Sequence, residues 1–439
     1  MRNIKRHIAR HISAIDDFIT NLITDIKIMS QSTKQTKEEY KMNGKVVVVL
    51  DSQAGSCGKG KFIGYLAQKG NPEIGINNFM SNAGHTCVLD DGREIMTQHL
   101  PTSMVSENTT LMIGPGAAIT PHILFDEIIK YHDLIGNRTI IVNPRAVAIT
   151  EEHAETERQI LRSGSTFKGC GAAQADKVMR QAMLFGEWYE NWTKEWVGVN
   201  SDENYDGYTF DEMKMIINII WVKDTMDYIN DTIDNGGNVI VEGSQGCDLD
   251  INYGLDYPNT TSRQCHAGQL VADCGISPRL VTDIIMIMRP YPIRISNITN
   301  LVDENGNTIV TSSGEYAGSE EITWDIVKER CGAPAEMEFG EITTVTKKVR
   351  RVFEPNWERL KYVVKLNRPT EIALNFAQYI DWDIMGKTNV EDITPKVWEF
   401  IRKVEEVTGV PVTMIGTGAK DGEIIDRKSN EREMPVRVL

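Results

Sequence analysis

The feature that most constrains the fold is a run of apolar, mostly β-branched residues followed at once by glycines, VVVVLDSQAGSCGKGKF at residues 46–62. An apolar run of this kind, closed by a glycine-rich turn, is typical of a strand that is buried on both faces of a parallel sheet. Comparable runs recur at 110–116, 139–149, 238–246 and 281–288. We therefore expect several buried parallel strands.

Segments with helical character lie between some of these runs. The clearest are HILFDEIIKYHDLI at 122–135 and TFDEMKMIINIIWVKDTMDYI at 209–229. Alternating strands and helices imply an α/β fold, in which helices cover both faces of a mostly parallel sheet. Nothing in the sequence divides residues 44–439. We expect them to form a single large domain around a central, mostly parallel sheet flanked by helices.

Residues 1–43 have a different pattern. Isoleucine and leucine recur at three- and four-residue steps from Ile4 to Ile26, which predicts an amphipathic helix, and the polar stretch SQSTKQTKEEYK follows as a linker. Two interpretations stay open. The segment is either a dispensable extension, such as sequence upstream of an internal start at Met42, or a docking helix.

Composition argues against several classes of function. Of the 439 residues, 47 are Lys or Arg and 62 are Asp or Glu, which gives a net charge of −15. That balance argues against a non-specific nucleic-acid coat, and no aliphatic run is long enough to cross a membrane. The seven cysteines form no CxxC pair. We therefore expect a reducing compartment, the cytoplasm.

The segment DSQAGSCGKGK has the character of a phosphate-binding loop. Gly55, Gly58 and Gly60 allow backbone N–H groups to approach phosphate oxygens closely. Lys59 and Lys61 add positive charge, and a strand before the loop and a helix after it would add a helix N-terminus. The spacing only approximates the usual GxxxxGK[ST] pattern, so a tight solvent-exposed turn is the alternative.

Further segments follow in an order that resembles one family. They are SNAGHTCV at 81–88, HLPTS at 99–103, VEGSQGCDLDINYG at 241–254 and GISPR at 275–279. Together with the loop they resemble adenylosuccinate synthetase over most of the chain. The resemblance implies a ligase that phosphorylates the 6-oxygen of a purine nucleotide, using a nucleoside triphosphate and Mg²⁺, and then displaces the phosphate with the amine of L-aspartate. It also implies a homodimer with shared sites.

Two positions depart from the family's loop, Gly-Asp-Glu-Gly-Lys-Gly-Lys. Ser56 stands where the family has the aspartate that takes the N1 proton and binds Mg²⁺, and Cys57 stands at the glutamate position. An unassisted serine is a weak base near neutral pH, so either the activity is lost or the substrate differs. A serine at this position resembles the phage 2-aminoadenylosuccinate synthetases, which act on dGMP instead of IMP.

The remaining catalytic residues follow from the resemblance. His85 is expected to contact the transferring phosphoryl group and the 6-oxygen, and Gln245 is expected to offer its amide to that oxygen. The carbonyl of Gly84 matches a Mg²⁺ ligand, and Ser56 is the second expected ligand. Asn82 matches a group that meets the nucleotide. A structural hydrogen bond is the alternative role for the histidine and the glutamine.

Residues 163–180 resemble the family segment that holds the monophosphate. The hydroxyl groups of Ser165 and Thr166 suit phosphate oxygens, and Lys168 replaces an arginine. Arg180 matches the arginine that reaches the nucleotide of the neighbouring subunit, with a solvated helix charge as the alternative. The full set expected to bind dGMP is Ser56, Asn82, Ser165, Thr166, Arg180, Gln245 and Cys265.

The segment EITTVTKKVRRVF at 341–353 resembles the family's aspartate-binding loop. A dicarboxylate requires clustered hydroxyl groups and cations. The residues expected to bind L-aspartate are Thr344, Val345, Thr346 and Arg350. An exposed basic strand is the alternative.

The donor nucleotide is expected near ALNFAQYID at 373–381. The family recognises guanine with an aspartate, but Ala377 stands at that position here. The amides of Asn375 and Gln378 suit the donor and acceptor edge of adenine, which favours ATP or dATP over GTP. The full donor set is Cys57, Gly58, Lys59, Gly60, Lys61, Asn375, Gln378, Gly416 and Gly418.

The sequence therefore predicts an enzyme that joins L-aspartate to C6 of dGMP through a 6-phosphoryl intermediate. Two other functions stay open: a divergent adenylosuccinate synthetase that acts on IMP with GTP, and an inactive nucleotide-binding protein. The group that removes the N1 proton also stays open, with solvent, phosphate and Ser56 as candidates.

Overall fold

The computed structural model describes residues 44–160, 165–196, 204–295, 298–302, 308–311, 313–314, 316–342 and 349–428. All of them belong to the unit Gly44–Leu439. The predicted N-terminal helix and linker at 1–43 lie outside the described residues and stay a prediction. Three residues expected to bind L-aspartate, Thr344, Val345 and Thr346, also lie outside them.

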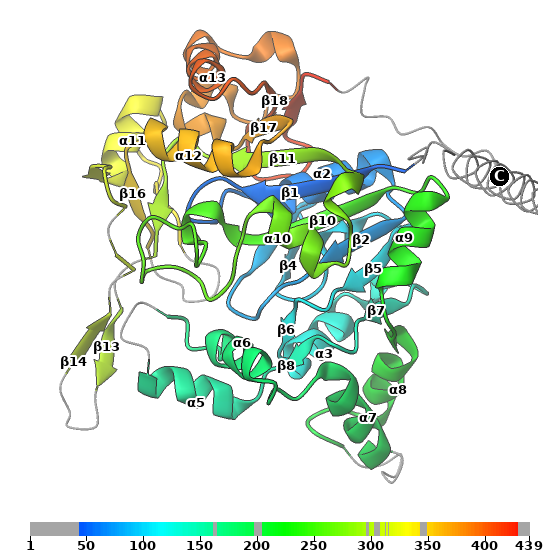
Figure 1. The fold of residues 1–439 in the computed structure, drawn as a ribbon. Helices are drawn as coiled ribbons and strands as arrows, with labels where there is room; N and C mark the ends of the chain where they lie inside the picture. Colours follow the sequence, from blue (N-terminus) through cyan, green and yellow to red (C-terminus); the bar gives the residue numbers. More distant parts are fainter. Residues whose placement is uncertain are drawn as a thin grey trace, which may run out of the picture. The chain divides into compact units, whose positions relative to one another are not determined.

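A ten-stranded sheet forms the centre of the described part of the chain (Figure 1). Its order is β19-β18-β17-β11-β1-β10-β2-β5-β7-β9. Neighbouring strands are parallel except β18 and β19 at one edge. The predicted α/β fold with a central, mostly parallel sheet is confirmed. The strands are β1 (Val46–Asp51), β2 (Ile74–Asn77), β5 (Thr110–Ile113), β7 (Ile140–Val142), β9 (Ile220–Val222), β10 (Val239–Gly246), β11 (Val281–Met288), β17 (Glu371–Leu374), β18 (Val412–Gly416) and β19 (Ile424–Asp426).

Helices flank the sheet, and shorter strands form small sheets beside it. The helices are α2 (Lys59–Gly70), α3 (Pro121–Lys130), α4 (His132–Ile135), α5 (Glu151–Ile160), α6 (Cys170–Met179), α7 (Phe185–Trp196), α8 (Phe210–Ile219), α9 (Met226–Asp234), α10 (Ala267–Asp273), α11 (Trp324–Cys331), α12 (Trp357–Asn367) and α13 (Pro395–Thr408). The small sheets pair β3 (His85–Val88) with β4 (Glu94–Thr97), β6 (Ala118–Ile119) with β8 (Val147–Ala148), β13 (Ile298–Val302) with β14 (Thr308–Thr311), and β16 (Arg351–Phe353) with both β12 (Ile293–Arg294) and β15 (Glu321–Ile322).

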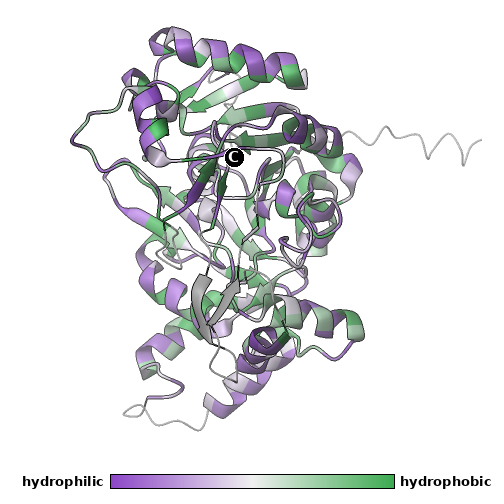
Figure 2. Ribbon diagram, turned by 90° about the vertical axis from the view of Figure 1, so that its left-hand side faces the viewer, coloured by the Kyte–Doolittle hydropathy of each residue, from purple (hydrophilic) through white to green (hydrophobic). Residues whose placement is uncertain are grey.

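The strand β1 shows how the sheet is covered on both faces. Val46, Val48 and Leu50 belong to an apolar cluster that includes residues of α10, whereas Val47 and Val49 belong to a cluster that includes residues of α2. Because successive side chains of a strand point to opposite faces, α2 and α10 lie on opposite faces of the sheet. In Figure 2 the strands are mostly hydrophobic, while the helices alternate between hydrophobic and hydrophilic residues.

Two predicted elements are divided in the structure. The helical stretch predicted at 209–229 is wrong at its centre, because Ile220–Val222 forms the edge strand β9 beside β7. The β-branched and aromatic side chains of this segment favour a strand. The run predicted at 139–149 is split into β7 and β8 around Pro144, which has no N–H group to donate to a strand ladder.

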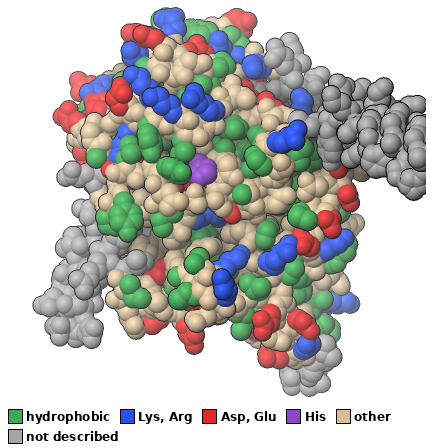
Figure 3. Space-filling view, viewed as in Figure 1, with side chains coloured by type: hydrophobic (Ala, Val, Ile, Leu, Met, Phe, Trp, Pro, Cys, Tyr) green, Lys and Arg blue, Asp and Glu red, His purple; other side chains and the backbone are tan. Residues whose placement is uncertain are grey.

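Charged side chains of both signs lie on the outer surface. Among the described side chains on the face seen in Figure 3, Lys and Arg are interspersed with Asp and Glu, without a continuous basic surface. No helix in the described part of the chain combines the length and the hydropathy that a membrane span requires.

The burial of β1 predicts a large loss of stability when one of its side chains is truncated. Leu50 is 1% exposed, and Leu50→Ala is expected to lower the free energy of unfolding by about 2–5 kcal/mol, because the cavity it leaves closes only partly. Urea denaturation followed by circular dichroism measures this loss. Met385→Ala, at a side chain that is 41% exposed, is the control and is expected to change stability by about 0.5 kcal/mol or less. Equal losses in the two variants would contradict the proposed core.

Candidate active site

The phosphate loop lies between a buried strand and a helix, as predicted. The strand β1 ends at Asp51 and α2 begins at Lys59. Gly58 has a φ of 92°, and a Cβ atom there would lie 2.1 Å from Nδ2 of Asn375, so only glycine fits. Ser56 also has a positive φ, 55°, although it is not glycine, and its side chain is exposed at the tip of the loop.

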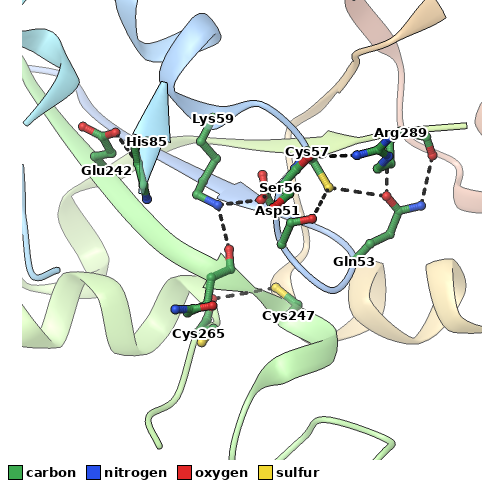
Figure 4. Close-up of polar contacts among 12 residues, drawn as sticks. Asp51, Gln53, Ser56, Cys57, Lys59, His85, Glu242, Cys247, Cys265 and Arg289 are labelled. Carbon is green, nitrogen blue, oxygen red and sulfur yellow. Dashed lines mark hydrogen bonds and ion pairs between the residues drawn. The ribbon is translucent and has the colours of Figure 1, made fainter. Parts of the chain in front are cut away.

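A carboxylate that the sequence analysis missed lies beneath the loop (Figure 4). Oδ2 of Asp51 lies 2.5 Å from Nζ of Lys59 and accepts a hydrogen bond from the Cys57 N–H group at 3.2 Å. Nζ of Lys59 also donates to the carbonyl of Gln245 at 2.7 Å. Both members of the ion pair are buried, and Oδ1 of Asp51 has no hydrogen-bond partner among the described residues. The only signal in the sequence was an acid at the end of a buried strand.

A cavity of about 400 Å³ adjoins the loop tip. It brings together side chains from distant parts of the sequence, because the loops that follow parallel strands meet at one edge of the sheet. The predicted site residues that line it are Ser56, Lys59, Asn82, Gly84, His85, Ser165, Thr166, Gln245 and Arg350.

A buried carboxylate holds the imidazole of His85. Nδ1 of His85 lies 2.7 Å from Oε1 of Glu242, which is 2% exposed on β10 (Figure 4). Glu242 also accepts hydrogen bonds from the N–H group and the hydroxyl of Thr102, at 2.8 and 2.6 Å. With Nδ1 engaged, Nε2 is the ring nitrogen left for a ligand. Glu242 lies within the segment VEGSQG that the sequence analysis singled out, but it was not predicted as a site residue.

Residues 48–382, which include the loop, the histidine and the cavity wall, match the family model described as adenylosuccinate synthetase. The chain belongs to the adenylosuccinate synthetase family. It is therefore an enzyme of purine-nucleotide synthesis, a ligase that forms a C–N bond, as predicted.

Relatives from phages and from archaea share the family. The N6-succino-2-amino-2′-deoxyadenylate synthase of Salmonella phage PMBT28 is 34% identical over 343 residues, 78% of this chain and 87% of that protein. The adenylosuccinate synthetase of Pyrococcus horikoshii is 29% identical over 387 residues, 87% of this chain and 98% of that protein. The structure of cyanophage S-2L succinoaminodeoxyadenylate synthetase, bound to dGMP and dATP, has a TM-score of 0.68 and 27% identity, and the match covers 88% of this chain and 97% of that one.

Two residues of this synthetase that were predicted to contact nucleotides, Cys57 and Cys265, do not line the cavity. The thiol of Cys57 is fully buried, where it donates to Oε1 of Gln53 at 3.4 Å, and burial raises its pKa well above the usual value. Cys265 is also buried, and its N–H group donates to Asp250. The cavity wall contains Thr261 instead, which the sequence analysis missed. Its Oγ1 atom is buried without a hydrogen-bond partner in the described structure.

The amides on the cavity wall contact each other. Nε2 of Gln245 donates to Oδ1 of Asn82 at 3.1 Å. Both residues line the cavity, so the pair presents one amide surface to a ligand. The hydroxyl of Ser165 accepts a hydrogen bond from the Phe167 N–H group at 3.0 Å, which holds that hydroxyl at the cavity wall.

Arg180 lies apart from the cavity of its own chain. It caps the C-terminal end of α6 in a left-handed conformation, with a φ of 64°, and its side chain is exposed. Beside it Val178 and Met179 are 81% and 58% exposed. An exposed arginine next to exposed apolar side chains has the character of a surface that a protein partner covers.

The predicted donor residues gather where β17 and β18 end. Asn375 donates from Nδ2 to the carbonyl of Cys57 at 2.9 Å, while its Oδ1 atom and Oε1 of Gln378 are buried without partners in the described part of the chain. Gly416 leaves room for Asn375, since a Cβ atom would lie 2.1 Å from Oδ1. Nζ of Lys61 donates to the carbonyl of Gly418 at 2.8 Å, and burial lowers the pKa of Lys61 to about 7.

The pairing of His85 with Glu242 predicts a loss of activity when the carboxylate becomes an amide. Glu242→Gln keeps the shape of the side chain but removes the charged acceptor that orients the imidazole through Nδ1. We expect kcat to fall by about 10- to 100-fold, measured as phosphate release in the steady state. Thr102→Val is the control, because it removes a hydrogen bond to the same carboxylate and keeps the charge. Equal losses in the two variants would show that the charge has no special role.

Proposed function

We propose that this ligase joins L-aspartate to C6 of dGMP with ATP or dATP as the phosphoryl donor. The products are 2-amino-2′-deoxy-N6-succinyl-AMP, phosphate and the nucleoside diphosphate. The name of the Salmonella phage relative supports this reaction, and so do the dGMP and dATP bound to the cyanophage relative. The strongest support within the chain is the chemistry of the loop tip.

At the loop tip, the described residues that line the cavity place no free carboxylate beside Ser56. Among the described residues that line the cavity, Glu157 is the only acid, and its oxygens accept the N–H groups of Gly169 and Gly171. Asp51 is buried and paired with Lys59. Guanine carries an amino group next to N1, where the base of IMP has only hydrogen. The short side chain of Ser56 leaves room for this group and can accept a hydrogen bond from it.

The cavity residues have separate roles in the proposed reaction. Nε2 of His85, fixed by Glu242, contacts the phosphoryl group on its way to the 6-oxygen, and the amide of Gln245 donates to that oxygen. Lys59 and the N-terminus of α2 balance the charge on the phosphates. The dicarboxylate of L-aspartate binds Arg350, and its amine then displaces the phosphate. The N1 proton leaves to Ser56, to phosphate or to solvent.

The chain's own oxygens fit a magnesium ion that arrives with the donor nucleotide. No group of three or more His, Cys, Asp or Glu side chains in the described structure could hold a metal ion by itself. The hydroxyl of Ser56 and the carbonyl of Gly84, both in the cavity wall, are neutral oxygens. They suit Mg²⁺ whose remaining ligands are phosphates and water. The ion would neutralise charge on the transferring phosphoryl group.

Two side-chain amides near the phosphate loop support adenine as the base of the donor nucleotide. Oδ1 of Asn375 and Oε1 of Gln378 are acceptors without partners in the described structure, and they suit the amino group of adenine.

The exposed side chains of Val178 and Met179 support a homodimer in which Arg180 reaches the dGMP of the neighbouring subunit.

A crossed turnover assay tests the substrates. L-aspartate and Mg²⁺ are supplied with dGMP or IMP, each paired with ATP, dATP or GTP, and products are identified by mass. We expect product only with dGMP, and with ATP or dATP as donor. Product from IMP with GTP would make the chain an ordinary adenylosuccinate synthetase. No product in any combination would favour an inactive nucleotide-binding protein.

The role of Ser56 is tested by restoring the family's acid. Ser56→Asp is expected to lower kcat/KM with dGMP by at least about tenfold and to allow some use of IMP, because the larger carboxylate crowds the 2-amino group and supplies a base for N1. Ser56→Ala is the matched control, since it leaves the same room but accepts no hydrogen bond. Unchanged use of dGMP by Ser56→Asp, with no use of IMP, would overturn the size argument.

A further inference from the structure

One fully buried arginine contacts the phosphate loop from the side opposite Lys59 (Figure 4). Arg289 follows the last residue of β11 and is 0% exposed. Its Nη1 atom donates to the carbonyl of Ser56 at 3.1 Å, and its Nε atom donates to the carbonyl of Tyr291 at 2.8 Å. The guanidinium also lies over the ring of Phe376, 4.4 Å from its centre. This side chain therefore helps to fix the position of Ser56, which has a positive φ.

The backbone of Arg289 is tied to the same loop. Its N–H group donates to Oε1 of Gln53 at 3.1 Å, and its carbonyl accepts from Nε2 of Gln53 at 3.0 Å. Oε1 of Gln53 also accepts the thiol of Cys57. The guanidinium therefore has little freedom to move relative to the loop.

The other side of the guanidinium binds Glu341 through both carboxylate oxygens. Nη1 donates to Oε2 at 3.1 Å and Nη2 donates to Oε1. Burial raises the pKa of Glu341, but the charge and hydrogen bonds of Arg289 outweigh it and hold that pKa below the usual value. The side chain of Glu341 is 15% exposed, and its charge is compensated first by Arg289, with smaller contributions from Arg350 and Tyr379.

Glu341 in turn lies next to the cation expected to bind L-aspartate. The N–H group of Arg350 donates to the carbonyl of Glu341 at 2.8 Å. Nε of Arg350 lies 3.9 Å from Oε2 of Glu341 and has no hydrogen-bond partner in the described structure. Arg289 binds both carboxylate oxygens of Glu341. The side chain of Arg350 therefore forms only a long ion pair with Glu341 and still lines the cavity.

We propose that Arg289 and Glu341 are positioning residues that couple the phosphate loop to Arg350. One guanidinium fixes the carbonyl of Ser56 and also neutralises Glu341, so the loop geometry and the availability of Arg350 change together. Binding of the purine nucleotide at the loop and of the dicarboxylate at Arg350 therefore reinforce each other. This inference rests on the proposed function in one respect, the assignment of L-aspartate to Arg350.

Three variants test the coupling. Arg289→Met removes the guanidinium and leaves Glu341 to pair with Arg350, so we expect the KM for L-aspartate to rise about tenfold or more and kcat to fall. In the double variant Arg289→Met, Glu341→Gln the competing charge is gone, so the KM for L-aspartate returns to within about threefold of wild type, while kcat stays low because Ser56 has lost its contact. Arg289→Lys keeps the positive charge but cannot donate to both carboxylate oxygens of Glu341 as a guanidinium does. We expect its KM for L-aspartate to be intermediate.

A matched control separates this effect from loss of stability. Arg138 also donates from its guanidinium to main-chain carbonyls, those of Met104 and Thr109 among them, and it does not line the cavity. Arg138→Met is expected to lower the melting temperature without changing the KM for L-aspartate. A double variant whose KM is as high as that of Arg289→Met, or higher, would overturn the coupling and leave a structural role.

The test does not depend on the identity of the nucleotide. If wild type uses IMP instead of dGMP, the proposed substrate is wrong, but the same KM comparison is made with IMP. If wild type turns over no nucleotide, calorimetry measures the affinity for L-aspartate with and without dGMP. Affinity that rises with dGMP in wild type and not in Arg289→Met supports the coupling. Wild-type affinity that is the same with and without dGMP, or absent in both cases, overturns it.

Discussion

The buried ion pair between Asp51 and Lys59 is the constraint on which the rest of the site depends. A lysine with 5% of its side chain exposed requires a counter-charge, and removal of either partner of such a pair costs about 3–5 kcal/mol. Asp51 supplies that charge from the end of β1, below the loop. The same carboxylate accepts the Cys57 N–H group, so the ion pair also fixes the loop backbone. The negative charge beside the phosphate loop is therefore part of the interior and not of the cavity wall.

The register of the sheet explains why this pair can organise several segments. Asp51 of β1 lies opposite Gly246 of β10, which brings the loop next to Gln245, and Lys59 donates to the carbonyl of Gln245. On the other side β11 places Arg289 next to Ser56. Because the three strands are parallel, all of these contacts lie at the carboxyl end of the sheet, where ligands bind in open α/β folds.

The fold and much of the cavity wall could be predicted from the sequence, because each depends on local patterns. The buried run at 46–50 predicts a parallel strand, and the segment around His85 carries a family motif. The interior partners could not be predicted in this way. Asp51, Glu242 and Arg289 lie within or directly after strand patterns, and their contacts span up to 236 residues along the chain. The β9 segment was missed because its helical surroundings outweighed three residues whose strand character depends on a neighbouring strand.

The placement of charge has a consequence for the chemistry. In a loop with an acid at its tip, one group can both take a proton from the purine and balance the phosphate-binding cations. Here the balancing carboxylate, Asp51, is committed to Lys59 and cannot reach the cavity, so the two tasks are separated. In the proposed reaction, catalysis then relies on groups that stabilise negative charge on the transferring phosphoryl group and the 6-oxygen, such as Lys59, the helix N-terminus and the imidazole held by Glu242, more than on a strong base. The proposed substrate suits this separation, because the hydroxyl of Ser56 can accept a hydrogen bond from the 2-amino group of dGMP, whereas a carboxylate at that position would act on the N1 proton.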